Sequence, residues 1–293
     1  MIERKIQLSN GVSLNTRFTE VEKGKPIVLF IHFSGGTSKM WEGVLPFFEK
    51  QYSVIAPDLR GHGKSDKPLA GYHIDDMADD LYLLTNDLGI MDCHVVGSSL
   101  GAEVGISLAA KHPELVTSIV CEGAIYNEFG EYGLYNGTTE EIEEEKIKRR
   151  VGLSERQLKK YVTKEEFIAD HSKDVQELGI NNKYFTSFFE SCIEEQSDGN
   201  YEHFYKNHIR TEYITKYWDL KFEEYYQHVK CPVLFLPSEE EMKDPNIQRS
   251  LHYFASLLQH YKIETIENSL HAYVWMQYPE IAAKKVLAFL TCP

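Results

Sequence analysis

The chain has 293 residues, of which 42% are hydrophobic, so it can bury one large core or two modest ones. Acidic residues outnumber basic residues by 45 to 31, and a net charge of −14 repels phosphate backbones and anionic lipids. We therefore expect a small-molecule substrate, with neither nucleic acid nor a membrane as partner. No run approaches the ~20 apolar residues of a membrane helix, and the charged start MIERKIQLSN is unlike a secretory signal. These features predict a cytoplasmic protein. We expect it to be a monomer or homodimer, although no sequence feature indicates the oligomeric state.

The cysteines form no C-x-x-C pair and have no metal-ligand spacing. We expect them to be small buried apolar residues rather than metal ligands. They are Cys93, Cys121, Cys192, Cys231 and Cys292.

The first predicted element is a β-hairpin. Residues 6–18, IQLSNGVSLNTRF, have two alternating runs around Asn10–Gly11, a pair that favours a tight turn. Next comes the apolar run PIVLFIH, residues 26–32, which is typical of a strand buried on both faces of a parallel sheet. Runs of this type recur at residues 52–58, 93–97, 116–122, 231–237 and 261–267.

Helix-like segments separate these runs, at residues 39–50, 74–88, 100–112, 246–260 and 274–290. Alternating strands and helices predict right-handed βαβ crossovers. The expected fold class is therefore α/β, with a mainly parallel central sheet of about eight strands. Helices would cover both faces, and the opening hairpin would form an antiparallel edge.

Residues 124–228 interrupt this alternation with charged and aromatic helical sequence and no convincing buried strand. We expect a helical cap here, over the carboxyl edge of a core made of residues 1–123 and 229–293. Its stretch TTEEIEEEKIKRR begins with a capping box, Thr138-x-x-Glu141, and is expected to form a solvated helix. Most of its many rings would pack the cap on the core, and a minority would line an apolar pocket.

The segment HVVGSSLGAEVG places Ser99 between a buried strand and a helix. This is the position of a nucleophile elbow, in which small residues two positions away let strand and helix approach closely. Gly97 and Gly101 supply that space. The N–H group of Leu100, at the start of the helix, would face a developing oxyanion.

A serine nucleophile needs a base, which in turn needs an orienting acid. For this turn the acid follows the serine in the chain and the histidine comes last. His271 lies in the loop NSLHAY before the final helix, at the same predicted sheet edge as Ser99. The loop SEEEMKDP supplies the acid, for which Glu241 is the preferred candidate. Close alternatives are Glu239, Glu240 and Asp244.

These segments together resemble the α/β-hydrolase superfamily, in its branch with a helical cap. The resemblance also rests on VLFIHFSGGTSKMW, APDLRGHGKSDKP and HAYVWMQYPEIAAKKVLAFL. It implies that Ser99 is the nucleophile, His271 the base and Glu241 the acid. It also implies an oxyanion hole formed by the N–H groups of Ser34 and Leu100.

Two positions depart from the family pattern. Phe33 stands where the family usually has glycine, so either the loop takes another path or Phe33 lines the pocket. The family acid is more often Asp than Glu, which leaves Glu122 as a less favoured substitute for Glu241. Trp218, in the predicted cap, is a further candidate for substrate contact.

The predicted function is hydrolysis of a small or medium apolar ester, thioester or lactone through an acyl-enzyme, without cofactor or metal. One alternative is hydrolysis of a carbon–carbon bond in a β-diketone-like substrate. The other is a non-hydrolytic ligand receptor or regulator built on the same fold.

Overall fold

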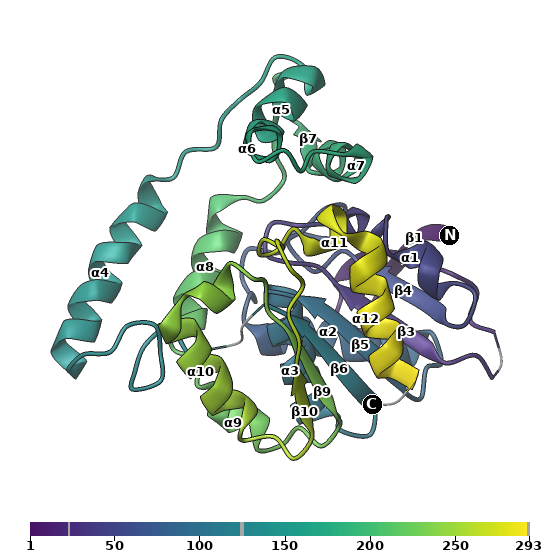
Figure 1. Ribbon diagram of the computed structural model, residues 1–293. Helices are drawn as coiled ribbons and strands as arrows, with labels where there is room; N and C mark the ends of the chain where they lie inside the picture. Colours follow the sequence, from purple (N-terminus) through teal and green to yellow (C-terminus); the bar gives the residue numbers. More distant parts are fainter. Residues whose placement is uncertain (23, 124–125, 292–293) are drawn as a thin grey trace.

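The computed structural model describes residues 1–22, 24–123 and 126–291. Eight strands form one sheet in the order β1-β2-β4-β3-β5-β6-β9-β10 (Figure 1). Only the β1–β2 and β2–β4 pairs of this sheet are antiparallel, which confirms the predicted fold class. The strands are β1 (Ile2–Gln7), β2 (Ser13–Phe18), β3 (Ile27–Ile31), β4 (Ser53–Pro57), β5 (Cys93–Ser98), β6 (Val116–Glu122), β9 (Val233–Leu236) and β10 (Tyr261–Ile263).

The opening hairpin is confirmed. Gly11 has a φ of 87°, which glycine adopts without strain, and the register pairs Ile6 with Leu14. Strand β2 then pairs antiparallel with β4, so the hairpin forms one edge of the sheet. The central strands β3, β4 and β5 are almost completely buried, as their unbroken apolar runs predict.

Helices cover both faces of the sheet. α2 (Ile74–Asp87) packs on α3 (Leu100–Lys111) on one face, and α1 (Leu45–Phe48) contacts α12 (Pro279–Thr291) on the other (Figure 1). Two predicted helices are each divided in two. The first consists of η1 (Ser38–Trp41) and α1, and the last of α11 (Val274–Gln277) and α12, because Pro279 starts a new helix.

The segment between β6 and β9 is mostly helical. Its long α4 starts at the predicted capping box, with both the Thr138 and the Glu141 hydrogen bonds formed. It also contains a short antiparallel pair, β7 with β8, whose half-buried residues form no apolar run and therefore gave no strand signal. The elements are α4 (Thr139–Glu155), α5 (Lys164–His171), α6 (Lys173–Glu177), α7 (Lys183–Ser191), β7 (Ile193–Glu195), β8 (Tyr201–His203), α8 (Asn207–Tyr217) and α9 (Phe222–Tyr226).

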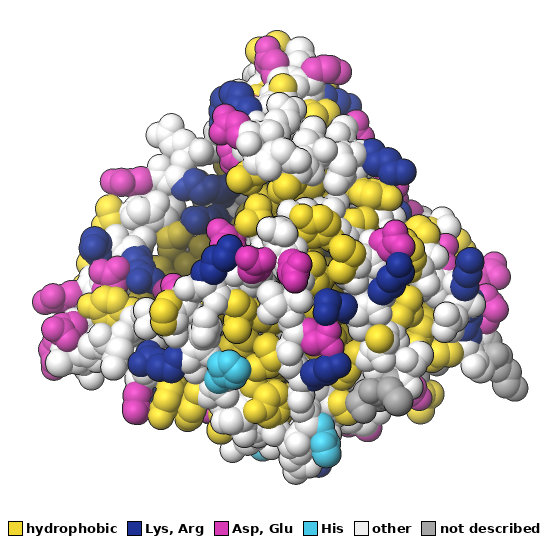
Figure 2. Space-filling model, viewed as in Figure 1, with side chains coloured by type: hydrophobic (Ala, Val, Ile, Leu, Met, Phe, Trp, Pro, Cys, Tyr) yellow, Lys and Arg dark blue, Asp and Glu magenta, His cyan; other side chains and the backbone are white. Residues whose placement is uncertain are grey.

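The helices between β6 and β9 occupy different places relative to the edge of the sheet. Helices α5, α6 and α7 stand beyond that edge, whereas α4 extends outward beside α8 (Figure 1). Helix α9 instead packs on the core, where the Tyr226 ring lies 6.2 Å from that of Phe235. Figure 2 shows a hollow beside α4, with hydrophobic side chains in its floor and basic side chains at its edge.

The remaining helix of the core, α10 (Pro245–Ala255), is capped by Asp244, whose side chain accepts a hydrogen bond from the Asn246 N–H. Among the described residues, no helix is both long and apolar enough to cross a membrane. Four cysteines are free thiols, of which Cys93, Cys121 and Cys192 are buried and Cys231 is half-buried. Cys292 lies outside the described residues, as do positions 124 and 125 at the expected start of the cap.

Candidate active site

Ser99 lies on the sharp turn between β5 and α3. Its φ of 51° and ψ of −118° are values that residues with a side chain rarely adopt. A Cβ atom at Gly97 would lie 2.4 Å from the Gly101 carbonyl carbon, and one at Gly101 would lie 2.0 Å from the Ile31 oxygen. Both glycines are therefore required by the close approach of strand and helix, as the sequence predicts.

The two adjacent serines have different environments. Ser98 is fully buried, and its hydroxyl donates to Oε2 of Glu122 at 2.5 Å. Ser99 is half-buried and lines a cavity. Ser99 is therefore the serine that a small molecule can reach.

His271 lies in the turn between β10 and α11 and lines the same cavity as Ser99. Its Nδ1 lies 3.2 Å from Oε1 of Glu122 and 3.5 Å from Oε2 of Glu241. The His271 side chain is 31% exposed, whereas the two carboxylates are buried. Because Nδ1 faces the carboxylates, Nε2 is the ring nitrogen that remains for a substrate or a hydroxyl group.

Two glutamates thus lie where an acid could orient His271, the role for which Glu241 is the preferred candidate from sequence. Glu122, the less favoured substitute, is the nearer of the two and ends strand β6. Glu241 is held by Ser238, whose N–H and hydroxyl both donate to its Oε2, at 2.8 and 2.9 Å. Gly123 follows Glu122 with a φ of 95°, and a Cβ atom there would lie 2.6 Å from Cε1 of His271.

The other three candidate acids lie elsewhere. Glu239 pairs with Lys243 at 3.0 Å and accepts a hydrogen bond from the Asn268 N–H. Glu240 precedes the short helix η2 (Glu241–Lys243), and exposed Asp244 caps α10. None of the three is among the residues that line the cavity with Ser99.

The electrostatics of His271 follow from this arrangement. Burial by itself lowers the pKa of the imidazole, but the charges and hydrogen bonds of Glu122 and Glu241 outweigh it. The pKa of His271 is therefore raised well above its usual range. The three groups also bring ligand atoms within 4.8 Å of one another, a spacing that a metal ion could bridge. The same spacing is that of an imidazole hydrogen-bonded to a carboxylate, so the geometry does not require a metal.

The loop after β3 carries the second predicted N–H donor. The His32 ring fixes this loop, because its Nδ1 contacts the Phe33 oxygen at 2.8 Å and its Nε2 accepts from the Leu59 N–H at 2.9 Å. Ser34 lines the cavity, and its hydroxyl contacts that of Tyr205 at 2.8 Å. Neither the Ser34 nor the Leu100 N–H donates a hydrogen bond to any residue in the described ranges.

Phe33 takes no part in lining this cavity. Its ring packs on Phe188 of α7, with 5.4 Å between ring centroids. Of the two residues proposed for substrate contact, the structure places only Trp218 along the cavity wall.

The cavity that contains Ser99 has a volume of about 410 Å³. The aromatic sequence of the cap predicts an apolar wall, but the structure shows a mixture of aromatic and charged side chains. Sequence reasoning missed Glu103, Glu128 and Arg210, and nothing in the local sequence of the last two marks them as cavity residues. The lining residues are Ser34, Ser99, Glu103, Tyr126, Glu128, Arg210, Tyr213, Ile214, Tyr217, Trp218, Glu241 and His271.

Glu103 is a buried carboxyl group in this wall. It lies four residues after Ser99, on the same side of helix α3, a spacing that could have indicated it from sequence. The Tyr213 hydroxyl of α8 donates to both of its oxygens, at 2.9 and 3.1 Å. Burial raises the pKa of Glu103 to about 7, against the smaller opposing effects of Tyr213 and His271. The group is therefore partly protonated at neutral pH.

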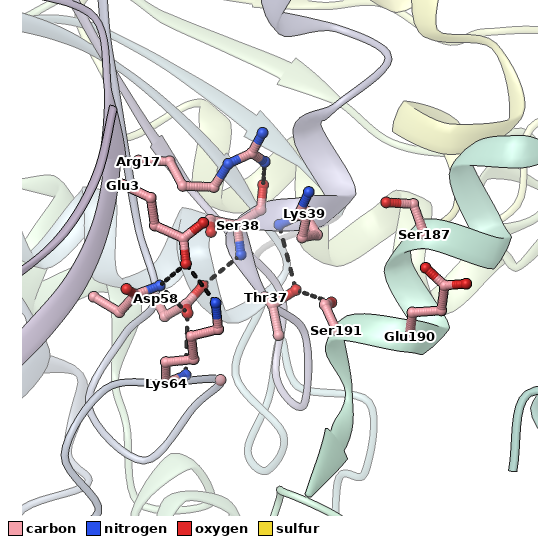
Figure 3. A pocket seen from close by; sticks show the side chains of 12 residues that line it. Glu3, Arg17, Thr37, Ser38, Lys39, Asp58, Lys64, Ser187, Glu190 and Ser191 are labelled. Atoms are coloured by element: carbon pink, nitrogen blue, oxygen red, sulfur yellow. Dashed lines mark hydrogen bonds and ion pairs between the residues drawn. The ribbon is translucent and has the colours of Figure 1, made fainter. Parts of the chain in front are cut away.

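A second cavity, of about 250 Å³, lies where α7 meets the loops after β3 and β4 (Figure 3). Its polar groups mostly satisfy one another: Asp58 accepts from the N–H groups of Ser38 and Lys64, and the Thr37 and Ser191 hydroxyls are 2.6 Å apart. It contains none of the predicted site residues. This cavity is therefore a weaker candidate for a reaction site than the one at Ser99.

Comparisons with known proteins identify the family of the chain. A family model described as the alpha/beta hydrolase fold matches residues 26–275. The chain is 39% identical over 120 residues to the 2-(acetamidomethylene)succinate hydrolase of Mesorhizobium japonicum. That alignment covers 41% of each chain, so the aligned part spans less than half of the curated relative.

Solved structures extend the likeness over the whole chain. The crystal structure of E-2-(acetamidomethylene)succinate hydrolase superposes with a TM-score of 0.77 and 25% identity, and covers 99% of both chains. A thioesterase domain from the curacin biosynthetic pathway has the same TM-score at 16% identity, covering 98% of this chain and 99% of its own. The second likeness is one of fold alone.

Proposed function

Because the chain belongs to the α/β hydrolase fold family, we propose that it is a serine hydrolase with Ser99 as nucleophile. The observation that carries this proposal is the position of His271 in the same cavity, with two carboxylates at its Nδ1. Such an arrangement orients the ring and stabilises the imidazolium that forms when Nε2 takes the serine proton. Glu122 and Glu241 share the role of the orienting acid.

The reaction begins when His271 removes the proton of Ser99 and the alkoxide attacks the substrate carbonyl. The oxyanion is held by the N–H groups of Ser34 and Leu100, and each such donor commonly contributes about 3 kcal/mol. His271 then protonates the leaving group, which gives an acyl-enzyme. Water, activated by the same imidazole, releases the acid and restores Ser99.

We place the reaction at the carbonyl of an ester, thioester or lactone. Residues of α8, namely Arg210, Tyr213 and Tyr217, form part of the cavity wall, which supports the interpretation of the segment up to residue 228 as a cap. The similar Mesorhizobium protein is named as the hydrolase of a substituted succinate, which supports a small acyl substrate.

A fluorophosphonate probe tests the proposal, because it forms a stable adduct only with an activated serine. We expect one adduct per chain, located on Ser99 by peptide mass spectrometry. Labelling should persist in Ser98→Ala and disappear in Ser99→Ala. Absence of an adduct on the folded wild-type protein would contradict a nucleophilic role for Ser99. If the adduct forms and the protein hydrolyses a β-diketone but no ester, the result would favour carbon–carbon bond hydrolysis instead.

A further inference from the structure

One charged group in the Ser99 cavity has no side-chain partner among the residues that the structure describes. Five charged side chains line this cavity: Glu103, Glu128, Arg210, Glu241 and His271. Four of them contact another side chain. Glu128 pairs with Arg149, and Glu103 accepts a hydrogen bond from Tyr213. Glu241 and His271 face each other. The guanidinium group of Arg210 forms no hydrogen bond or ion pair with any side chain in the part of the chain that the structure describes.

A second guanidinium group lies close to the first. Arg156 donates to the Tyr205 carbonyl at 3.3 Å and to Oδ1 of Asn207 at 3.1 Å. Burial, and then the positive charge of Arg210, lower the pKa of Arg156, so the two cations are within electrostatic reach of each other. Neither has a carboxylate partner among the described residues, although the chain has 14 more acidic than basic residues. Two neighbouring cations without a counterion favour the binding of an anion.

The guanidinium group of Arg210 lies in the same cavity as the proposed reacting group, Ser99. Burial raises the pKa of Tyr205 to about 12, and the hydrogen bond to Ser34 and the charges of Arg210 and Arg156 oppose that rise. The charge of Arg210 therefore acts on the Tyr205 hydroxyl, which contacts Ser34. An anion bound at Arg210 would lie in the same cavity as Ser99, so that both could contact one small molecule.

Glu103 does not act as the counterion of Arg210. Its carboxyl group receives the Tyr213 hydroxyl, and the charge that acts on it is that of His271. With a pKa of about 7, it is also partly neutral under physiological conditions. The positive charge of Arg210 is thus left for a ligand.

We propose that Arg210 binds a carboxylate of the substrate, so that this hydrolase acts on acyl compounds that carry a negative charge away from the scissile bond. Guanidinium groups bind carboxylates through two parallel hydrogen bonds, which fixes orientation as well as adding affinity. The inference rests on the proposed role of Ser99 and deepens it, and it replaces the expectation of a purely apolar substrate.

A matched pair of substrates tests this selectivity. Mono-p-nitrophenyl glutarate and p-nitrophenyl pentanoate have acyl chains of the same length and differ in the terminal carboxylate. We expect a higher kcat/KM for the glutarate, and a loss of about 10- to 100-fold for that substrate in Arg210→Gln. Turnover of the pentanoate should change less than about threefold. Arg210→Lys should be intermediate, because it keeps the charge but loses the paired hydrogen bonds.

The control variant is Arg249→Gln, which removes an exposed arginine of α10 that does not line the cavity. It should leave both substrates unaffected. Thermal unfolding of each variant checks that the protein remains folded. An equal loss for both substrates in Arg210→Gln, or no preference for the glutarate in the wild type, would overturn the proposal.

Binding without turnover separates this inference from the proposed function. In Ser99→Ala, calorimetry should show that monomethyl glutarate binds at least about tenfold more tightly than dimethyl glutarate. Adding Arg210→Gln should abolish that difference. Arginine-dependent binding without ester hydrolysis by the wild type would contradict the proposed function alone. Hydrolysis without arginine-dependent binding would contradict this inference alone.

Discussion

Glu122 and Glu241 approach the same nitrogen, Nδ1 of His271, from two neighbouring strands of the sheet. Glu122 is the last residue of β6, where it pairs in register with Leu236 of β9, and Glu241 follows β9 by five residues. Each carboxylate has a serine partner of its own, Ser98 for Glu122 and Ser238 for Glu241. The imidazole is therefore oriented by two independently anchored acids.

The first prediction concerns the loss of one or both acids. Glu122→Gln or Glu241→Gln should each lower kcat by about 10- to 100-fold, because the remaining carboxylate still orients His271. The double variant should lose about 10⁴-fold, as is usual when an orienting acid is removed entirely. Steady-state kinetics with a p-nitrophenyl ester measures each value. A single variant as inactive as the double variant would assign the role to that residue alone.

The second prediction concerns pH. The two carboxylates raise the pKa of His271, so at lower pH the ring is protonated and cannot accept the Ser99 proton. Activity should therefore increase with pH through the raised pKa of His271. Glu122→Gln should shift this limb of the kcat/KM profile to lower pH, whereas the exposed-site control Glu240→Gln should not. A limb at the same pH in Glu122→Gln would show that Glu122 does not act on the ring.

The third prediction concerns stability and Glu103. Its pKa is about 7 in the folded protein against a reference value of 4.5, so the folded state holds the proton more tightly. Stability is therefore lost as pH rises from 4.5 to 7, by up to roughly 3 kcal/mol at full ionisation. Glu103→Gln removes the ionisable group, and with it this pH-dependent loss of stability, but keeps an oxygen that can accept the Tyr213 hydrogen bond. Urea unfolding at pH 5 and pH 8 should show a smaller loss in the variant, and an equal loss would contradict the raised pKa.

The fourth prediction concerns the glycines of the Ser99 turn. Gly101→Ala would place a Cβ atom 2.0 Å from the Ile31 carbonyl oxygen, which is backbone and cannot move aside. We expect a loss of at least about 3 kcal/mol in the free energy of unfolding. The control is Gly152→Ala in α4, where a Cβ atom meets nothing within 4 Å and should stabilise the helix by about 0.5–1 kcal/mol. Chemical unfolding measures both, and a tolerated Gly101→Ala would contradict the close packing at the turn.

Local patterns were sufficient to predict the sheet and to place Ser99 and His271 at one cavity. Ser99 and His271 could be placed because each follows a strand at the carboxyl edge, and the spacing of Gly97 and Gly101 marks the turn. The order of the two acids could not be predicted, because it depends on the register of β6 against β9 and on how far each side chain reaches. Arg210 could not be predicted either, since its role depends on what surrounds it in three dimensions.

The hydrogen bond from Tyr213 to Glu103 joins helix α8 to helix α3 across the cavity wall. In the function proposed above, helix α3 follows the nucleophile Ser99, and helix α8 carries Arg210, which selects the substrate. On that proposal, the chemistry and the specificity are encoded in separate stretches of the gene. Exchange of the second stretch would then change the specificity and keep the chemistry, provided that the exchanged piece restores its hydrogen bonds to the core, including those of Tyr213 with Glu103 and Tyr205 with Ser34.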